Sequence, residues 1–138
     1  MTYRDYSKPY RDLGEAFIDI VLKHEKGTDE EISKISMWYY DFVSIITKIP
    51  LNSEGMYDGL AYHYHVDEPW KECEDELWAV DEVELSLLQL MKSKENLKSD
   101  TGQTEEDQTT LIRICNDMIG LFKESNEGDG KVYIKYYY

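Results

Sequence analysis

The chain has 138 residues and a formal net charge of −14, from 29 acidic against 15 basic residues. This length fits one domain that can bury about two-thirds of its unfolded surface, so neither disulfides nor a metal are needed to hold a core. The acidity disfavours direct binding to nucleic acid or to a membrane surface, because both are polyanionic. With 41% hydrophobic and 13% aromatic residues, the chain is too apolar to be disordered. We therefore expect residues 1–138 to form a single folded domain.

The first half of the chain carries two runs of apolar residues at helical spacing. The first run predicts a helix from about Pro9 to His24, with Gly27 placed to terminate it. The second begins at Thr28, the first residue of a T-x-x-E capping pattern, and ends at Pro50. The two apolar stripes are Tyr10, Leu13, Phe17, Ile20 and Val21, and then Ile32, Ile35, Tyr39, Phe42, Ile46 and Ile49.

Two segments favour extended structure. Residues 51–66 are rich in turn formers and end in segment 61–66, which fits either a short strand or a helical turn. The C-terminal segment 131–138 is rich in tyrosine, valine and isoleucine, which favour strands. Segments 61–66 and 131–138 are expected to pair as a small ribbon on the helices.

The second half predicts two further helices. Asp67 is a suitable N-cap for a helix over 68–97, and Pro69 suits its first turn. After a polar loop, Thr104 with Asp107 can cap a fourth helix. The two apolar stripes are Trp70, Cys73, Leu77, Val80, Leu87, Leu88 and Met91, and then Leu111, Cys115, Met118 and Phe122. The predicted fold is therefore all-α, a bundle of about four helices with a short C-terminal β-ribbon or extended tail.

The two cysteines, Cys73 and Cys115, both fall within apolar stripes and form no C-x-x-C pair. Buried, reduced thiols in a cytoplasmic protein are the simplest interpretation. Residues 1–20 lack the basic start and continuous apolar run of a signal peptide. No stretch reaches the roughly 20 apolar residues of a membrane span. The expected location is therefore the cytoplasm.

Acidic residues are concentrated between positions 67 and 84. These 18 residues contain nine acidic residues and one basic residue, Lys71, which gives −8 of the total −14. On the third predicted helix, Glu68, Asp75 and Glu82 recur every seven residues on the face opposite the stripe. Solubility alone would explain such a face, and so would a binding surface for lysine and arginine. The predicted partner-binding carboxylates are Glu68, Glu72, Glu74, Asp75, Glu76, Asp81 and Glu82.

Glu84 is unusual because it lies inside the apolar stripe of the third predicted helix, between Val80 and Leu87. Either the bundle opens there and Glu84 reaches water, or its carboxylate is buried and needs a partner. An unpaired buried charge is very costly, and Arg113 on the fourth predicted helix is a candidate partner. A buried Glu84 would be a candidate functional residue.

The H-x-H pair His63 and His65 would point to one side of a strand, where Asp67, Glu68 or His24 could complete a metal site. Two histidines in a tyrosine-rich turn are more often surface residues. We therefore expect no metal at this position.

The pattern E-x-x-D at Glu72 and Asp75 resembles half of the signature of the all-α nucleotide pyrophosphohydrolases, whose carboxylates hold Mg²⁺. The E-x-x-E helix that should precede it is missing, and Asp12 with Glu15 is the nearest pair. The sequence also contains no G-x-S-x-G, P-loop, G-x-G-x-x-G or E-x-x-H pattern. We therefore expect no catalytic residue and no cofactor.

Tyrosine is unusually frequent, with 12 copies, more than one small core needs. Tyrosine is enriched at recognition surfaces because it buries a large area with little loss of rotamer freedom. Tyr62 and Tyr64 are therefore added to the predicted partner-binding residues. Exposed tyrosines at the C-terminus would also favour a homo-oligomer.

Size, acidity and the cluster at 67–84 make the chain similar in kind to acidic toxin-immunity proteins and to phage-encoded inhibitors of nucleic-acid enzymes. This resemblance implies a protein that neutralises a basic protein partner, a toxin or a nucleic-acid enzyme. Carboxylates would steer that partner, and tyrosines would supply the desolvated contact area. A metal-dependent hydrolase on a helical bundle and a structural oligomer are the alternatives.

Overall fold

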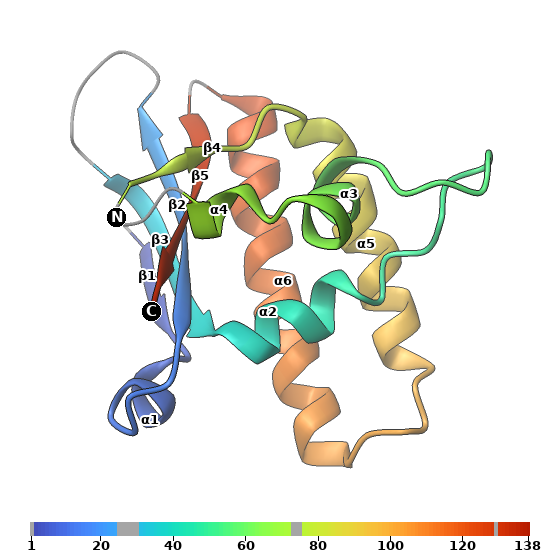
Figure 1. Ribbon diagram of the computed structural model, residues 1–138, viewed down its shortest axis with the longest axis horizontal. Helices are drawn as coiled ribbons and strands as arrows, with labels where there is room; N and C mark the ends of the chain where they lie inside the picture. Colours follow the sequence, from blue (N-terminus) through green and yellow to red (C-terminus); the bar gives the residue numbers. More distant parts are fainter. Residues whose placement is uncertain (1, 25–30, 73–75, 129) are drawn as a thin grey trace.

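The computed structural model describes residues 2–24, 31–72, 76–128 and 130–138. It is a mixed α/β structure, 50% helix and 23% strand, built on a five-stranded sheet. The predicted all-α bundle of four helices is therefore wrong. In Figure 1 the sheet stands on one side, helices α2 and α6 lie against one of its faces, and α5 lies beyond α6.

The sheet has the strand order β1-β3-β2-β5-β4. The edge strand β1 runs parallel to β3, and all other neighbours are antiparallel. The central strand β2 places Ile20 opposite both Ile35 and Ile134. The strands are β1 (Thr2–Asp5), β2 (Phe17–His24), β3 (Glu31–Trp38), β4 (Trp78–Ala79) and β5 (Gly130–Tyr137).

Strand β2 replaces most of the first predicted helix. Ile18, Ile20 and Leu22 alternate along the strand, and all three are buried against the helices. Asp19 and Val21 point to the other face and are also buried. The predicted helix over 9–24 is therefore wrong, and helix is limited to the single turn of α1, Lys8–Arg11.

Two more predicted helices are interrupted in the structure. The second predicted helix begins as strand β3 and becomes helical only at α2. Its predicted cap, Thr28, lies outside the described residues, and so does Gly27. The third is divided into α4, β4 and α5. Segment 61–66 lies in α3, so its predicted pairing with the C-terminus is wrong. The C-terminal strand is confirmed, but it pairs with β2 and β4.

The helices after α1 are α2 (Tyr39–Ile46), α3 (Gly59–Val66), α4 (Pro69–Glu72), α5 (Val83–Lys98) and α6 (Glu105–Glu127). Helix α6 is the predicted fourth helix, and Thr104 caps it by accepting a hydrogen bond from the Asp107 N–H at 3.2 Å. None of the helices in the described ranges is long and apolar enough to cross a membrane.

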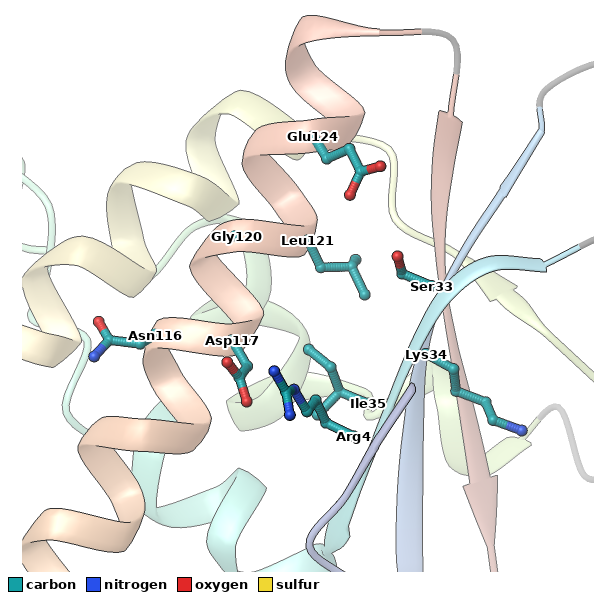
Figure 2. Close-up of a pocket in the computed structure, with 9 residues that line it drawn as sticks. All are labelled: Arg4, Ser33, Lys34, Ile35, Asn116, Asp117, Gly120, Leu121 and Glu124. Carbon is teal, nitrogen blue, oxygen red and sulfur yellow. The ribbon is translucent and has the colours of Figure 1, made fainter. Parts of the chain in front are cut away.

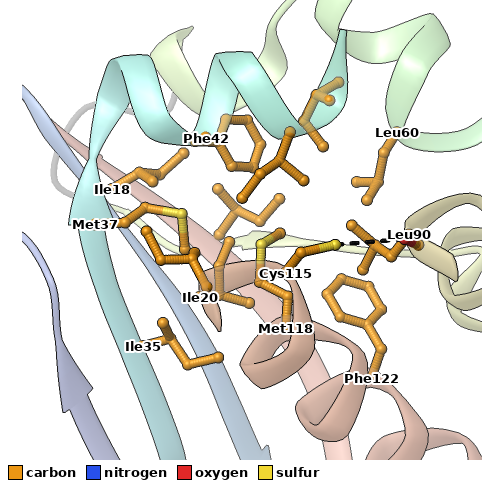
Figure 3. Close-up of a cluster of buried hydrophobic side chains, with 14 of the residues drawn as sticks. Ile18, Ile20, Ile35, Met37, Phe42, Leu60, Leu90, Cys115, Met118 and Phe122 are labelled. Carbon is orange, nitrogen blue, oxygen red and sulfur yellow. Dashed lines mark hydrogen bonds between the residues drawn. The ribbon is translucent and has the colours of Figure 1, made fainter. Parts of the chain in front are cut away.

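The core lies between the sheet and α6, with α2, α3 and α5 closing its other sides. Figure 3 shows Met37 and Ile20 of the sheet facing Met118 and Cys115 of α6. The Cys115 thiol is fully buried and donates to the Leu90 carbonyl at 3.4 Å. Cys115 is free and buried, as the sequence predicts. Burial raises the pKa of its thiol to about 11. Cys73 lies outside the described residues.

One carboxylate at the start of α2 titrates unusually. Burial, and then the nearby Asp107 carboxylate, raise the pKa of Asp41 from 3.8 to about 6. The folded state therefore holds this proton more tightly than the unfolded chain, and Asp41 becomes destabilising as the pH rises from about 4 to about 6. We expect Asp41→Asn to raise the free energy of unfolding by about 1 kcal/mol at about pH 8, allowing for solvent screening.

Urea denaturation of both proteins checks this prediction. The advantage of the Asp41→Asn variant should shrink below pH 6 and vanish near pH 4, where the wild-type carboxyl is protonated in both states. An advantage that is the same at both pH values would contradict it.

Candidate functional site

The acidic stretch at 67–84 does not form one helix. It runs from the end of α3 through α4 and β4 to the start of α5. In Figure 1 these segments follow one another across the front of the helices to the β4 edge of the sheet. The predicted alignment of Glu68, Asp75 and Glu82 on one helical face is therefore wrong.

We use the name acidic face for five side chains of this stretch, distributed over α4, the residues flanking β4 and the first turn of α5. They are exposed, and none has an ion pair with any residue that the structure describes. Other carboxylates are paired, for example Asp100 with Lys48 at 2.7 Å. The acidic face consists of Glu72, Glu76, Asp81, Glu82 and Glu84.

Glu84 belongs to this face because the first turn of α5 projects it into solvent. Of the two interpretations of Glu84, the one that places it in water is confirmed. Arg113, its candidate partner, is exposed on α6 and makes no ion pair with Glu84. The exposed carboxylate near the N-terminus of α5 is favoured by the helix dipole.

Glu68 differs from the acidic face because its charge is satisfied inside the chain. The Tyr39 hydroxyl donates to Glu68 Oε1, and Lys71 Nζ lies 3.3 Å from Glu68 Oε2. The ammonium of Lys71 also lies 4.6 Å from the centre of the Tyr39 ring, a cation–π contact. Burial and the Glu68 hydrogen bond both raise the pKa of Tyr39. Glu68 also has a φ of +40°, a strained conformation for a residue with a side chain.

The other predicted partner-binding residues are placed as follows. Tyr62 is exposed on α3, with its ring edge-on to His63. Tyr64 is half-buried and packs against the core. Glu74 and Asp75 lie outside the described residues.

The predicted H-x-H site changes because residues 63 and 65 are in a helix. Positions two apart on a helix do not share a face, so the premise of one common side is wrong. His63 Nδ1 lies 3.1 Å from Asp67 Oδ1, whereas the His65 ring stacks on Tyr57 at 4.0 Å. Within the described part of the chain, no group of three or more His, Cys, Asp or Glu side chains is placed to hold a metal ion.

A groove beside α5 is not predicted by the sequence pattern. Leu88 and Met91, predicted to lie in the core, are 56% and 49% exposed. The helix instead turns Ser86, Gln89 and Ser93 inward. The groove has a volume of about 540 Å³. Its lining, which we call the α5 groove, comprises Ile49, Pro50, Leu51, Asn52, Ser53, Asp58, Leu85, Leu88, Gln89, Met91, Lys92 and Glu95.

A second, smaller cavity of about 270 Å³ lies between the β1–β3 edge of the sheet and α6. Figure 2 shows Arg4 projecting toward Asp117, while Lys34 points away from α6. Asp117 already accepts a hydrogen bond from the Tyr6 hydroxyl. Glu124 and Lys34 add one charge of each sign, so the lining has no net charge to select a ligand.

Comparison with known proteins found no matching family model, curated protein or solved structure. The functional interpretation therefore rests on the charges, exposure and geometry of this chain.

Proposed function

We propose that this chain binds a basic protein partner through the acidic face and neutralises it, as an inhibitor or immunity-type protein does. The observation that supports this most is the set of five exposed carboxylates that have no ion pair with a described residue. Such a surface attracts a basic protein over a distance of several ångströms and orients it before contact. A toxin or a nucleic-acid enzyme, whose own site must attract phosphates, fits this surface.

The distribution of the basic residues supports the same proposal. Lys131 and Lys135 alternate with the buried Val132 and Ile134 of β5, so they lie on the sheet face turned away from α6. Lys34 of β3 lies on that face too (Figure 2). Of these three cations, Lys131 lines the same cavity as Asp81 and so lies beside the acidic face. The five carboxylates outnumber it, and the face keeps a negative potential.

The proposal is tested by capturing partners from the native source with the full chain, at about 50 mM and about 500 mM salt. A captured basic protein is then purified, and its affinity for the chain is measured by calorimetry. We expect Glu76→Lys combined with Asp81→Lys to weaken binding by about 100-fold, because both reversals place like charges against a basic surface. The captured partner should also lose its own activity when saturated with the wild-type chain.

The matched control is Glu15→Lys combined with Glu124→Lys, which changes the net charge equally. Both residues are exposed, Glu15 after α1 and Glu124 near the C-terminus of α6, and neither belongs to the acidic face. This control should keep nearly wild-type affinity. If the Glu76/Asp81 variant bound as tightly as the wild type, the acidic face would not be the binding surface. If the partner stayed active when saturated with the wild-type chain, the chain would not be its inhibitor.

A further inference from the structure

The α5 groove is elongated along the helix that forms one of its walls. Its lining on α5 extends from Leu85 to Glu95, which corresponds to about 15 Å of helix. The opposite wall is formed by residues 49–53 and Asp58. This length matches two to three turns of a helix lying along α5.

The groove is held open by hydrogen bonds between its two walls. Gln89 Nε2 donates to the Asp58 carbonyl at 2.8 Å and to Asp58 Oδ1 at 3.0 Å. Within the opposite wall, Asn52 Nδ2 donates to Asp58 Oδ2 at 3.1 Å. Outside the lining, Asn96 Nδ2 of α5 donates to the Lys48 carbonyl at 2.8 Å and also ties α5 to the chain before residue 49. The polar groups of the walls therefore satisfy one another, and the groove needs little rearrangement to bind.

The groove exposes apolar side chains to water. Leu51 is 50% exposed, opposite the exposed Leu88 and Met91 of α5. An apolar patch with a polar rim is typical of a binding groove. Burying these three side chains would release water from a surface that the chain itself leaves uncovered.

The charge around the groove selects among occupants. Glu95 and Asp58 line it, and Lys92 is the one base in the lining. Lys92 Nζ is 4.0 Å from Glu95, at the limit of an ion pair. Glu84 of the acidic face lies one helical turn before Leu88 on α5, so the two side chains are neighbours on the helix surface. The groove therefore continues the acidic face and favours a ligand whose apolar side is flanked by bases.

From this geometry we infer that the α5 groove binds the apolar side of a basic, amphipathic helix of the partner protein. The inference rests on the proposed function and adds to it an apolar anchor beside the steering charges. Helix-in-groove recognition places apolar residues, spaced three and four apart, in such a groove. The partner's lysines or arginines would face Glu84, Asp58 and Glu95.

A model peptide tests the inference without the natural partner. The probe is a labelled helical peptide of about 18 residues, built from leucine and lysine with an apolar stripe, and its binding to the full chain is followed by fluorescence anisotropy. A second peptide carries glutamate in place of every lysine. We expect the lysine peptide to bind and the glutamate peptide to bind at least about tenfold more weakly. Added salt should weaken the binding of the lysine peptide.

The matched variants separate the groove from the rest of the surface. Leu88→Ala combined with Met91→Ala should weaken binding of the lysine peptide by about tenfold, because the variant loses two apolar contacts. Leu13→Ala removes a leucine after α1 that is even more exposed, at 79%, and should leave binding unchanged. Both groove residues are half-exposed, so the double variant should fold, which circular dichroism verifies.

Three results would overturn the inference. The lysine peptide could bind the double variant as well as the wild type, or the glutamate peptide could bind equally well. The chain could also self-associate in sedimentation through Leu88 and Met91, which would make a second copy the occupant. These failures leave the proposed function intact, because that function is tested separately by charge reversal at Glu76 and Asp81.

Discussion

Trp70→Ala is expected to lower the free energy of unfolding by about 3–5 kcal/mol, because it empties a large site in a closed core. Trp70 is fully buried, and its ring lies edge-on to Phe42 at 5.4 Å and to Trp78 at 5.7 Å. It is the buried residue of α4, a single turn that cannot be stable alone. The substitution should therefore release the part of the acidic face that α4 carries.

Urea denaturation followed by circular dichroism measures the Trp70 effect. Trp70→Phe should lose less stability than Trp70→Ala, because it leaves a smaller cavity. Trp38→Ala is the second comparison. Trp38 is only half-buried, and its ring stacks on Tyr10 at 4.2 Å. This substitution should lower the free energy of unfolding by about 1–2 kcal/mol. A Trp70→Ala variant that loses less than Trp38→Ala would contradict the assignment of Trp70 as the anchor.

The second large effect is expected at Gln89, the buried amide that joins α5 to α3. Its Oε1 accepts from the Leu60 N–H at 3.0 Å, and its Nε2 donates to Asp58. Gln89→Leu keeps the volume but leaves the buried Leu60 N–H without its acceptor, which should cost about 2–3 kcal/mol. Because Asp58 is released from α5, the variant should also bind the lysine peptide more weakly than the wild type.

Two comparisons make the Gln89 prediction specific. Lys92→Leu adds a leucine at an exposed position of α5 and should change the stability by no more than about 0.5 kcal/mol. Gly59→Ala should destabilise like Gln89→Leu, because Gly59 has a φ of +53° and an added Cβ would lie 2.6 Å from Gln89 Oε1. Wild-type stability of Gln89→Leu would show that this amide does not hold the groove wall.

The sequence pattern failed at β2 for a physical reason. Ile18, Ile20 and Leu22 face the helices, but Asp19 and Val21 on the other face are buried too. A strand buried on both faces shows no clear alternation, so its apolar residues also fit a helical spacing. The β-branched residues of this segment favoured a strand and were the available signal.

The position of α5 was mispredicted for a different reason. Hydrophobic spacing assigns Leu88 and Met91 to the core, whereas the buried residues of α5 are Ser86, Gln89, Leu90, Ser93 and Leu97. Ser93 Oγ donates to the Ile45 carbonyl at 2.6 Å, so its burial is compensated by a backbone acceptor distant in sequence. A single sequence does not reveal that acceptor, and it therefore does not reveal the groove.

Local interactions determined what the sequence predicted correctly. The cap at Thr104, the buried stripe of α6 and the C-terminal strand depend on neighbouring residues and on side-chain type. The net charge and its concentration between residues 67 and 84 are likewise properties of the sequence alone.

Only the tertiary structure decided which of those carboxylates stay unpaired and where the apolar surface is open. Glu68 is neutralised by Lys71, whereas Glu76 and Asp81 remain exposed beside β4. These outcomes depend on the pairing of β4 and β5 and on hydrogen bonds between α5 and residues distant in the chain. Contacts of this kind follow from the packing of the whole domain, and local propensity does not contain them.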